Sequence, residues 1–313
     1  MQASFFHPRF WPTWIGLGVL RLIVFLPFPI QIAIGRGMGS IFSALFKRRR
    51  HIIEVNIALC FPELSADEQK KLVDENIKST TLGIIETAFG WWASDKAILS
   101  RSRTEGFELL EQAKKEGRGV LLLGAHLTTL DLSGRVIGLN ADIDITYKEQ
   151  DNPLFNYWMD KARKRSFGNI IEKNAMRSMV KSLRSGRVVW YAPDQDFGRQ
   201  GSVFVPFFHR PAATLTTAGK LLKMTGVKPL FYAHFRKKEN GRIVYVARIC
   251  DLYHDDFNDD DIHNTTLINK ALAEILREHP EQYLWAHERF RTQPNPGDPK
   301  PYTKYKKKKK KPE

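Results

Sequence analysis

A short apolar run, Val120–Leu123, is the feature that most constrains the fold of this chain. Gly117 and Gly119 precede it, and no polar side chain interrupts it. A half-exposed strand would alternate polar and apolar residues, so a continuous run of this length is typical of a strand buried on both faces in a sheet covered by helices. Ile143–Tyr147 and Val188–Tyr191 are predicted as the second and third strands of the same sheet.

Helical patterns alternate with these strands through most of the chain. Ser65–Glu68 has the S-x-x-E form of a capping box and predicts a helix that continues to about Ala93, with Glu86 interrupting its apolar stripe. Lys228–Phe235 and Ile243–Ile249 alternate like paired strands. Further helices are predicted over 105–116, 152–166, 175–184, 212–226 and 262–279. The sequence therefore predicts an α/β protein with a mixed sheet flanked by helices.

A histidine and a carboxylate follow the first strand. Gly124 and Ala125 keep side chains small where the backbone turns, and then come His126 and, five positions later, Asp131. Residues five apart on a regular helix are about 140° apart, so we expect His126 in the turn and Asp131 after the first helical turn. From there, the carboxylate would reach back to one imidazole nitrogen. Such a pair suits proton removal from a hydroxyl group at neutral pH, although a buried structural histidine is the alternative interpretation.

The first 46 residues are the most hydrophobic part of the chain. Trp14–Leu26 is apolar apart from Arg21, and Ile30–Gly35 continues the run after two prolines. The uninterrupted stretch is shorter than the roughly 20 residues of a membrane span, which leaves open a kinked span, a helix at the interface and a buried core helix. Early aromatic residues and the basic cluster Lys47–Arg50 favour the membrane. We therefore predict a membrane-anchoring segment over 1–46, with the chain after Lys47 on the cytoplasmic side.

Positive charge dominates the composition, because the formal net charge is +15. The tail 295–313 is rich in Lys and Pro and is predicted to be a disordered polybasic segment. The charge favours an anionic partner, such as lipid headgroups, an acidic carrier protein, a phosphorylated substrate or nucleic acid. No recognised nucleic-acid module precedes the tail, so we expect no nucleic-acid binding. Cys60 and Cys250 lack the spacing of a disulfide framework or metal site, which favours a reducing compartment.

Two further groups of charged residues follow the histidine. The helix predicted over 152–166 carries the basic residues Lys161, Arg163, Lys164 and Arg165, a run that is equally typical of a solvated face. The third strand ends in APDQDFG, where Asp194 and Asp196 are candidates for metal ligands, loop carboxylates or partners of Arg163. Two carboxylates without a nearby second histidine are weak support for a catalytic metal, so no metal site is predicted.

Six segments occur in an order and spacing similar to the late acyltransferases of lipid A biosynthesis. They are HPRFWPTWIGLG, KRRRHIIEVNIALCFPELS, HLTTLD, YKEQDNPLFNYW, VVWYAPDQDFG and PEQYLWAHERFRT. His126 and Asp131 match the H-x-x-x-x-D box that this family shares with glycerol-phosphate acyltransferases, whose fold the resemblance implies for residues 47–294. The chain departs from many lauroyl-transferring members at two positions, since they have Glu in place of Asp131 and Arg in place of Lys148.

The resemblance implies transfer of a fatty acyl chain from an acyl-carrier-protein thioester to Kdo-lipid IVA, with no other cofactor. The acceptor would be a hydroxyl of a primary acyl chain, and overall similarity favours a lauroyl donor. The family's functional arginine falls on Arg163 and its functional aspartate on Asp194, and we add Lys148, Arg165 and Asp196 as candidates for substrate contacts. The implied location is the cytoplasmic face of the inner membrane, against anionic lipids. The sequence does not indicate an oligomeric state.

Two other functions remain open from the sequence. The H-x-x-x-x-D box alone would permit acylation of a glycerol phosphate. A basic membrane-bound adaptor without enzymatic activity would leave His126 and Asp131 with a structural role only.

Overall fold

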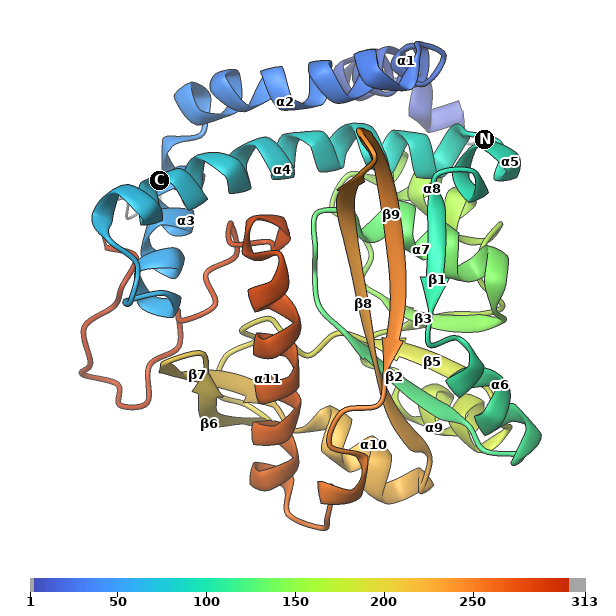
Figure 1. Cartoon of the computed structure of the whole chain (residues 1–313), viewed down its shortest axis with the longest axis vertical. Coiled ribbons are helices and arrows are strands. Elements are labelled where there is room, and N and C mark those ends of the chain that lie inside the picture. The colour runs from blue at the N-terminus through green and yellow to red at the C-terminus, as the bar shows by residue number, and fades with distance from the viewer. Residues whose placement is uncertain (1–2, 304–313) are drawn as a thin grey trace.

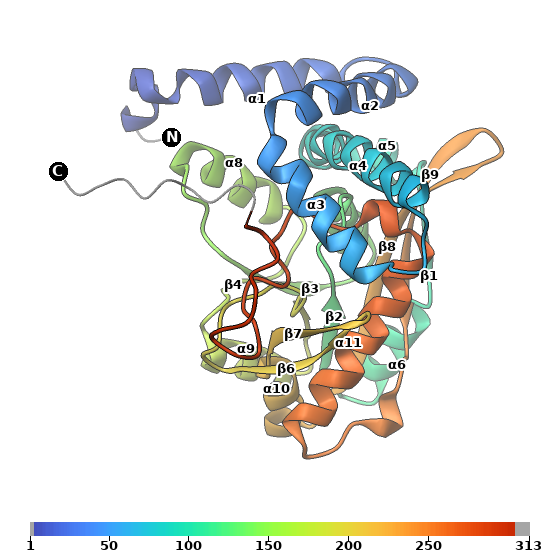
Figure 2. The same ribbon diagram turned by 90° about the vertical axis from the view of Figure 1, so that its left-hand side faces the viewer.

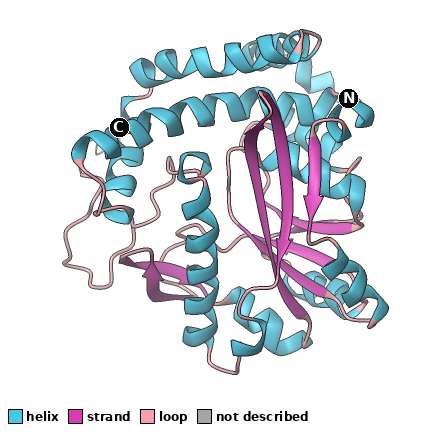
Figure 3. Cartoon of the chain, in the orientation of Figure 1, coloured by secondary structure: helices cyan, strands magenta, loops and turns pink. Residues whose placement is uncertain are grey.

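A seven-stranded sheet forms the centre of the protein, and the computed structural model describes residues 3–303 (Figures 1 and 3). The strand order is β1-β9-β8-β2-β5-β3-β4, and every neighbouring pair is parallel except β8 and β9. The strands are β1 (Ser102–Glu105), β2 (Val120–Gly124), β3 (Ile143–Tyr147), β4 (Ile170–Glu172), β5 (Val188–Tyr191), β8 (Lys228–Glu239) and β9 (Arg242–Cys250). The predicted mixed sheet flanked by helices is confirmed.

Helices cover both faces of this sheet. The long helix α4 begins with the predicted capping box, in which the Ser65 hydroxyl accepts a hydrogen bond from Glu68 N and the Glu68 carboxylate accepts one from Ser65 N. The helices are α1 (Trp11–Val24), α2 (Phe28–Leu45), α3 (Lys47–Cys60), α4 (Ala66–Trp92), α5 (Asp95–Leu99), α6 (Glu108–Lys115), α7 (Leu130–Asn140), α8 (Pro153–Arg163), α9 (Met176–Arg184), α10 (Thr217–Thr225) and α11 (Asp261–Glu278).

The core lies on both sides of β2. Leu121 and Leu123 belong to a buried cluster that includes side chains of α9 and α11, whereas Val120 and Leu122 belong to another that includes side chains of α6 and α7. All four β2 side chains are almost completely buried. The continuous apolar run therefore reflects a strand covered on both faces, as predicted.

The helix predicted over 212–226 begins too early. Residues 212–215 belong to strand β7 (Arg210–Leu215), which pairs antiparallel with β6 (Ser202–Phe207), and α10 begins only at Thr217. Ala212 and Ala213 are completely buried in this small sheet. Their helix propensity is overridden by packing, because local propensity is a weak signal beside tertiary contacts.

The hydrophobic N-terminus forms two helices rather than one. α1 ends at Val24 and α2 begins at Phe28, and the buried Gln31 side chain fixes the corner by donating hydrogen bonds to Val24 O (3.1 Å) and Leu26 O (2.8 Å). None of the helices within residues 3–303 has both the length and the apolar content required to cross a membrane. Membrane anchoring by residues 1–46 therefore stays a prediction.

The described residues continue past residue 294, the predicted end of the acyltransferase domain. The Tyr302 hydroxyl donates a hydrogen bond to Asn56 Oδ1 (2.6 Å) and accepts one from Phe290 N (3.0 Å). Contacts with the folded part therefore extend to Tyr302. The lysine run of the predicted disordered tail, residues 306–311, lies outside the described residues.

Gly83 of α4 allows the helix to approach the turn after β2. A Cβ at this position would lie 2.5 Å from the Thr128 carbonyl oxygen. We expect Gly83→Ala to lower the free energy of unfolding by about 1–3 kcal/mol, because backbone must move to make room. The measurement is urea unfolding, with Gly37→Ala in α2 as a control because its Cβ meets nothing within 4 Å. Equal losses in the two variants would contradict this explanation.

Candidate active site

His126 lies in the turn between β2 and α7, as predicted, and its partner is Asp194. The Asp194 carboxylate accepts hydrogen bonds from His126 Nδ1 (2.7 Å) and from His126 N (2.8 Å). Asp194 follows β5, the parallel neighbour of β2, so both residues lie beyond the carboxyl ends of adjacent strands. Asp194 is completely buried, whereas the His126 side chain is 27% exposed. The pairing places the proton on Nδ1 and leaves Nε2 available to a substrate.

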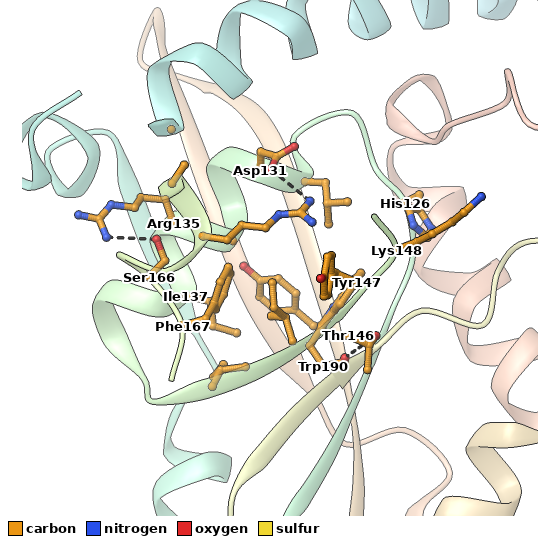
Figure 4. A pocket seen from close by; sticks show the side chains of 18 of the residues that line it. His126, Asp131, Arg135, Ile137, Thr146, Tyr147, Lys148, Ser166, Phe167 and Trp190 are labelled. Atoms are coloured by element: carbon orange, nitrogen blue, oxygen red, sulfur yellow. Dashed lines mark hydrogen bonds and ion pairs between the residues drawn. The ribbon is translucent and has the colours of Figure 1, made fainter. Parts of the chain in front are cut away.

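The predicted contact between Asp131 and His126 is wrong. Asp131 lies in the first turn of α7, but its Oδ1 accepts a hydrogen bond from Arg163 Nη2 (3.4 Å), drawn as a dashed line in Figure 4. No hydrogen bond joins Asp131 to His126 among residues 3–303. The physical reason is that α7 begins at Leu130, so the Asp131 side chain faces α8. Asp194, which follows β5, accepts the hydrogen bond from the imidazole instead. Asp131, rather than Asp194, is therefore the partner of Arg163.

The electrostatic interaction between His126 and Asp194 favours His126 as a base. Burial alone lowers the pKa of His126, but the charge of Asp194 and its hydrogen bond outweigh burial, and the pKa lies above its ordinary value. Burial raises the pKa of Asp194, but the interactions with His126 are stronger and lower it to about 2. Asp194 is consequently ionised at any ordinary pH and stabilises a protonated His126.

A cavity of about 410 Å³ opens beside His126 (Figure 4). One part of its lining is charged and includes Asp131, Lys148 and Arg163. Another part is apolar and aromatic, with side chains from α7, β3, the segment after α8, and β5 that include Ile137, Ile143, Ile145, Phe167 and Trp190. The cavity thus offers both an apolar wall and cationic side chains next to a candidate base.

Arg165 and Asp196, which were predicted to contact the substrate, lie outside this lining, as does Asp194. The Arg165 guanidinium donates a hydrogen bond to Trp91 O (3.1 Å), which ties the end of α8 to α4. The Asp196 carboxylate accepts hydrogen bonds from Thr292 N (2.7 Å) and Gly198 N (2.8 Å). Asp196 therefore shapes its loop. Within residues 3–303, no group of three or more His, Cys, Asp and Glu side chains is arranged to hold a metal ion.

The segment after α11 holds the turn that carries His126 from the other side, a contact that the sequence does not reveal. Thr128 N donates to Gln282 O (2.7 Å), and Leu284 N donates to His126 O (2.9 Å). The Tyr283 hydroxyl donates to Asp194 O (3.2 Å). PEQYLW therefore fixes His126 and Asp194 together. The PEQYLW motif is recognisable in the sequence. Its contact with the distant His126 turn depends on the three-dimensional fold and cannot be predicted from the sequence.

Comparison with known proteins places these residues in a family. The sequence model of the family described as bacterial lipid A biosynthesis acyltransferase matches residues 1–292. The lipid A biosynthesis palmitoleoyltransferase of Escherichia coli (strain K12) is 38% identical over 295 residues, covering 94% of this chain and 95% of the relative. The lauroyltransferase of lipid A biosynthesis from the same strain is 36% identical over 297 residues, with coverage of 94% and 95%.

A third relative and one solved structure also align with this chain. A lipid A biosynthesis acyltransferase of Haemophilus influenzae is 35% identical over 311 residues, covering 96% of this chain and 97% of the relative. Among solved structures, the 1-acyl-sn-glycerophosphate acyltransferase of Thermotoga maritima aligns with a TM-score of 0.37 and 12% identity, covering 82% of this chain and 98% of that chain. That similarity is too low to inform the site. The match over residues 1–292 and the identities of 35–38% confirm that the chain belongs to the bacterial lipid A biosynthesis acyltransferase family.

Proposed function

We propose that this protein is a lipid A biosynthesis acyltransferase that moves a fatty acyl chain from an acyl-carrier-protein thioester to Kdo-lipid IVA. Its family and the names of its relatives support acyl transfer and a lipid A substrate. The observation in the site that best supports the chemistry is the His126–Asp194 hydrogen bond beside a partly apolar cavity. The acceptor is a hydroxyl of an acyl chain already present on the precursor.

The proposed reaction needs one base and no covalent enzyme intermediate. His126 Nε2 removes the proton from the acceptor hydroxyl as its oxygen attacks the thioester carbonyl. Asp194 stabilises the imidazolium that forms, because it accepts the hydrogen bond from Nδ1. The tetrahedral intermediate then releases the carrier thiolate, which takes the proton back from His126. An ester has formed, a thioester has broken, and the histidine is neutral again.

Arg163 and Lys148 are the proposed contacts for the charged part of the acceptor. Both line the cavity, and the Arg163 side chain is partly exposed. Asp131 engages one nitrogen of the guanidinium, so other donors of Arg163 can bind a phosphate or carboxylate. In this arrangement, Asp131 positions Arg163 rather than His126.

The proposed donor is lauroyl, and the proposed location is the cytoplasmic face of the inner membrane. The relatives named as lauroyl- and palmitoleoyltransferases are similarly close to this chain, so the donor must be measured directly. The free cysteines Cys60 and Cys250 are compatible with a reducing compartment. The net charge of +15 is complementary to the acidic acyl carrier protein and to anionic lipids.

The test is acyl transfer by purified protein from a panel of acyl-carrier-protein thioesters to Kdo-lipid IVA. Mass spectrometry should show one added acyl chain, and folded His126→Ala should add none. The panel also identifies the preferred chain length. Transfer to glycerol 3-phosphate in place of Kdo-lipid IVA would replace the proposed acceptor. Lipid binding without any transfer would indicate the adaptor function.

The rate should depend on the protonation state of His126. Only the neutral imidazole can accept a proton, so kcat/KM is expected to rise with pH through an apparent pKa above the ordinary value of about 6.5. Asp194 adds no second inflection, because its pKa of about 2 lies below the useful range. The measurement is kcat/KM against pH with a stable acyl donor. A rate that falls as pH rises across this range would contradict the role of His126 as the base.

A further inference from the structure

The apolar part of the cavity beside His126 is a slot between α7 and the central sheet. Gly134 and Ile137 of α7 line it, and they lie three residues apart on one side of the helix. Ile143 and Ile145 of β3 line it from the sheet, and their spacing of two places both on the same face. Ile137 is seven positions after the first residue of α7, so the slot extends about 10 Å along this helix from the turn that carries His126.

The two ends of the slot differ in polarity. In Figure 4, His126 and Lys148 lie at one end of the lining. Phe167, Arg135 and Ser166 lie at the other end. The Arg135 side chain is buried, and its guanidinium donates a hydrogen bond to Ser166 Oγ (3.2 Å). The apolar lining is therefore bounded by Phe167 and this polar pair at the end away from His126.

Phe167 is held firmly between the helix and the sheet. It lies in the segment 164–169 that connects α8 to β4, two elements on the same side of the molecule in Figure 2. Gly168 N donates to Ile143 O (2.9 Å), which ties the segment to β3. A Cβ at Gly138 would lie 2.1 Å from Ser166 O, so α7 contacts the backbone of the segment directly. The aromatic ring is thus a fixed wall of the slot.

Gly134 keeps the middle of the slot open. A Cβ at this position would lie 3.1 Å from Phe167 Cζ, the tip of the aromatic ring. Gly134 lies in the interior of α7, where glycine is a poor helix former, so helix stability does not explain its presence. The absence of a side chain instead leaves space between α7 and Phe167. A larger residue at position 134 and a smaller one at position 167 would change the depth of the slot in opposite directions.

We propose that the slot holds the acyl chain of the donor thioester and that Gly134 and Phe167 limit the length of that chain. The thioester carbonyl lies beside His126, and the methyl end of the chain points towards Phe167. Apolar walls favour each buried methylene, whereas carbons beyond Phe167 would meet the polar groups that close the slot. Lys148 and Arg163 line the same cavity and stay available to the acceptor. The inference rests on the proposed function, because that function supplies the donor.

The first test measures kcat/KM for a series of acyl-carrier-protein thioesters from octanoyl to palmitoyl. Burial of one methylene corresponds to about fourfold in kcat/KM, so excluding two or more should disfavour the longer chains by roughly tenfold or more. Gly134→Leu should move the optimum to shorter chains than in the wild type, and Phe167→Ala should move it to longer chains. Each optimum compares rates within one preparation, so a partly unfolded variant does not change it.

Gly37→Leu is the matched control for Gly134→Leu. It adds the same side chain to α2 at a position where a Cβ meets nothing within 4 Å, and it should leave the chain-length profile unchanged. Losses that are equal for all donors would overturn the inference. Shifts in the same direction in Gly134→Leu and Phe167→Ala would also overturn it.

The second test locates the chain without turnover. A lauroyl thioester of acyl carrier protein, with a diazirine at its terminal carbon, is irradiated with the full chain in the absence of Kdo-lipid IVA. Mass spectrometry of the peptides should place the label within residues 134–145 or 166–168. Gly134→Leu should lose most of this label, and Gly37→Leu should keep it. Label placed elsewhere, or retained by Gly134→Leu, would overturn the inference.

The labelling and transfer experiments fail independently of each other. Labelling of the slot in a protein that transfers nothing to Kdo-lipid IVA would support the slot and contradict the proposed reaction. Transfer by a protein whose label lies outside the slot would support the reaction and overturn the inference.

Discussion

Asp194→Asn is expected to lower kcat by about 10²–10⁴-fold while leaving the fold intact. Asparagine has the shape of aspartate, but its amide cannot stabilise the imidazolium and can accept or donate at His126 Nδ1, which favours the wrong tautomer. The observed hydrogen bonds from His126 Nδ1 (2.7 Å) and N (2.8 Å) both end on this carboxylate. Steady-state kinetics and thermal unfolding of the same preparation provide the measurement.

Asp131→Asn is the matched control. It removes the same charge from the aspartate of the H-x-x-x-x-D box, but this carboxylate contacts Arg163 rather than His126. We expect its main effect on KM for the acceptor, because Arg163 loses its positioning partner. The apparent pKa of the rate should fall strongly in Asp194→Asn, since Asp194 is the main cause of the raised pKa of His126, and only slightly in Asp131→Asn. The reverse order of effects would restore Asp131 as the orienting carboxylate.

The two residues of the H-x-x-x-x-D box differ in how far local spacing determines their contacts. The turn position of His126 followed correctly from the spacing of residues 120–131, because local geometry determines it. The partner of His126 depends instead on strand order, in which β2 pairs with β5 at Leu121↔Val189. Asp194 was already a candidate at the end of the third strand. A single sequence contains no measure of which strand ends are neighbours, so spacing along the chain favours the nearer carboxylate, Asp131.

Glu86 illustrates the same limit in the long helix α4. The sequence showed only that a carboxylate interrupts an apolar stripe. In the structure, Glu86 is 2% exposed and pairs with Arg236 of β8, through Arg236 Nε to Oε1 (2.6 Å) and Nη2 to Oε2 (2.9 Å). The Tyr245 hydroxyl also donates to Glu86 (2.6 Å). Helix and hairpin were both predicted, but their contact could not be, because it joins residues 150 positions apart.

Glu86→Ala is expected to lower the free energy of unfolding by about 3–5 kcal/mol, because it leaves a buried guanidinium without its counter-charge. Burial lowers the pKa of Arg236, but the Glu86 carboxylate outweighs burial and raises it, so the arginine is charged in the native protein. For a domain of this size, the unfolding temperature should fall by roughly 6–10 °C. Arg236 also contacts Ser79 Oγ (3.2 Å) beside Thr128, so kcat should fall together with stability.

The double variant Glu86→Leu/Arg236→Met separates charge from shape. If the loss in Glu86→Ala comes from an unpaired buried charge, removing both charges and restoring apolar volume should recover most of the stability. The turn that carries His126 would still be held by Gln282 and Leu284 through backbone hydrogen bonds, so kcat should recover with stability. A double variant no more stable than Glu86→Ala would mean that the hydrogen bonds of this network, including that from Tyr245, matter more than its charges.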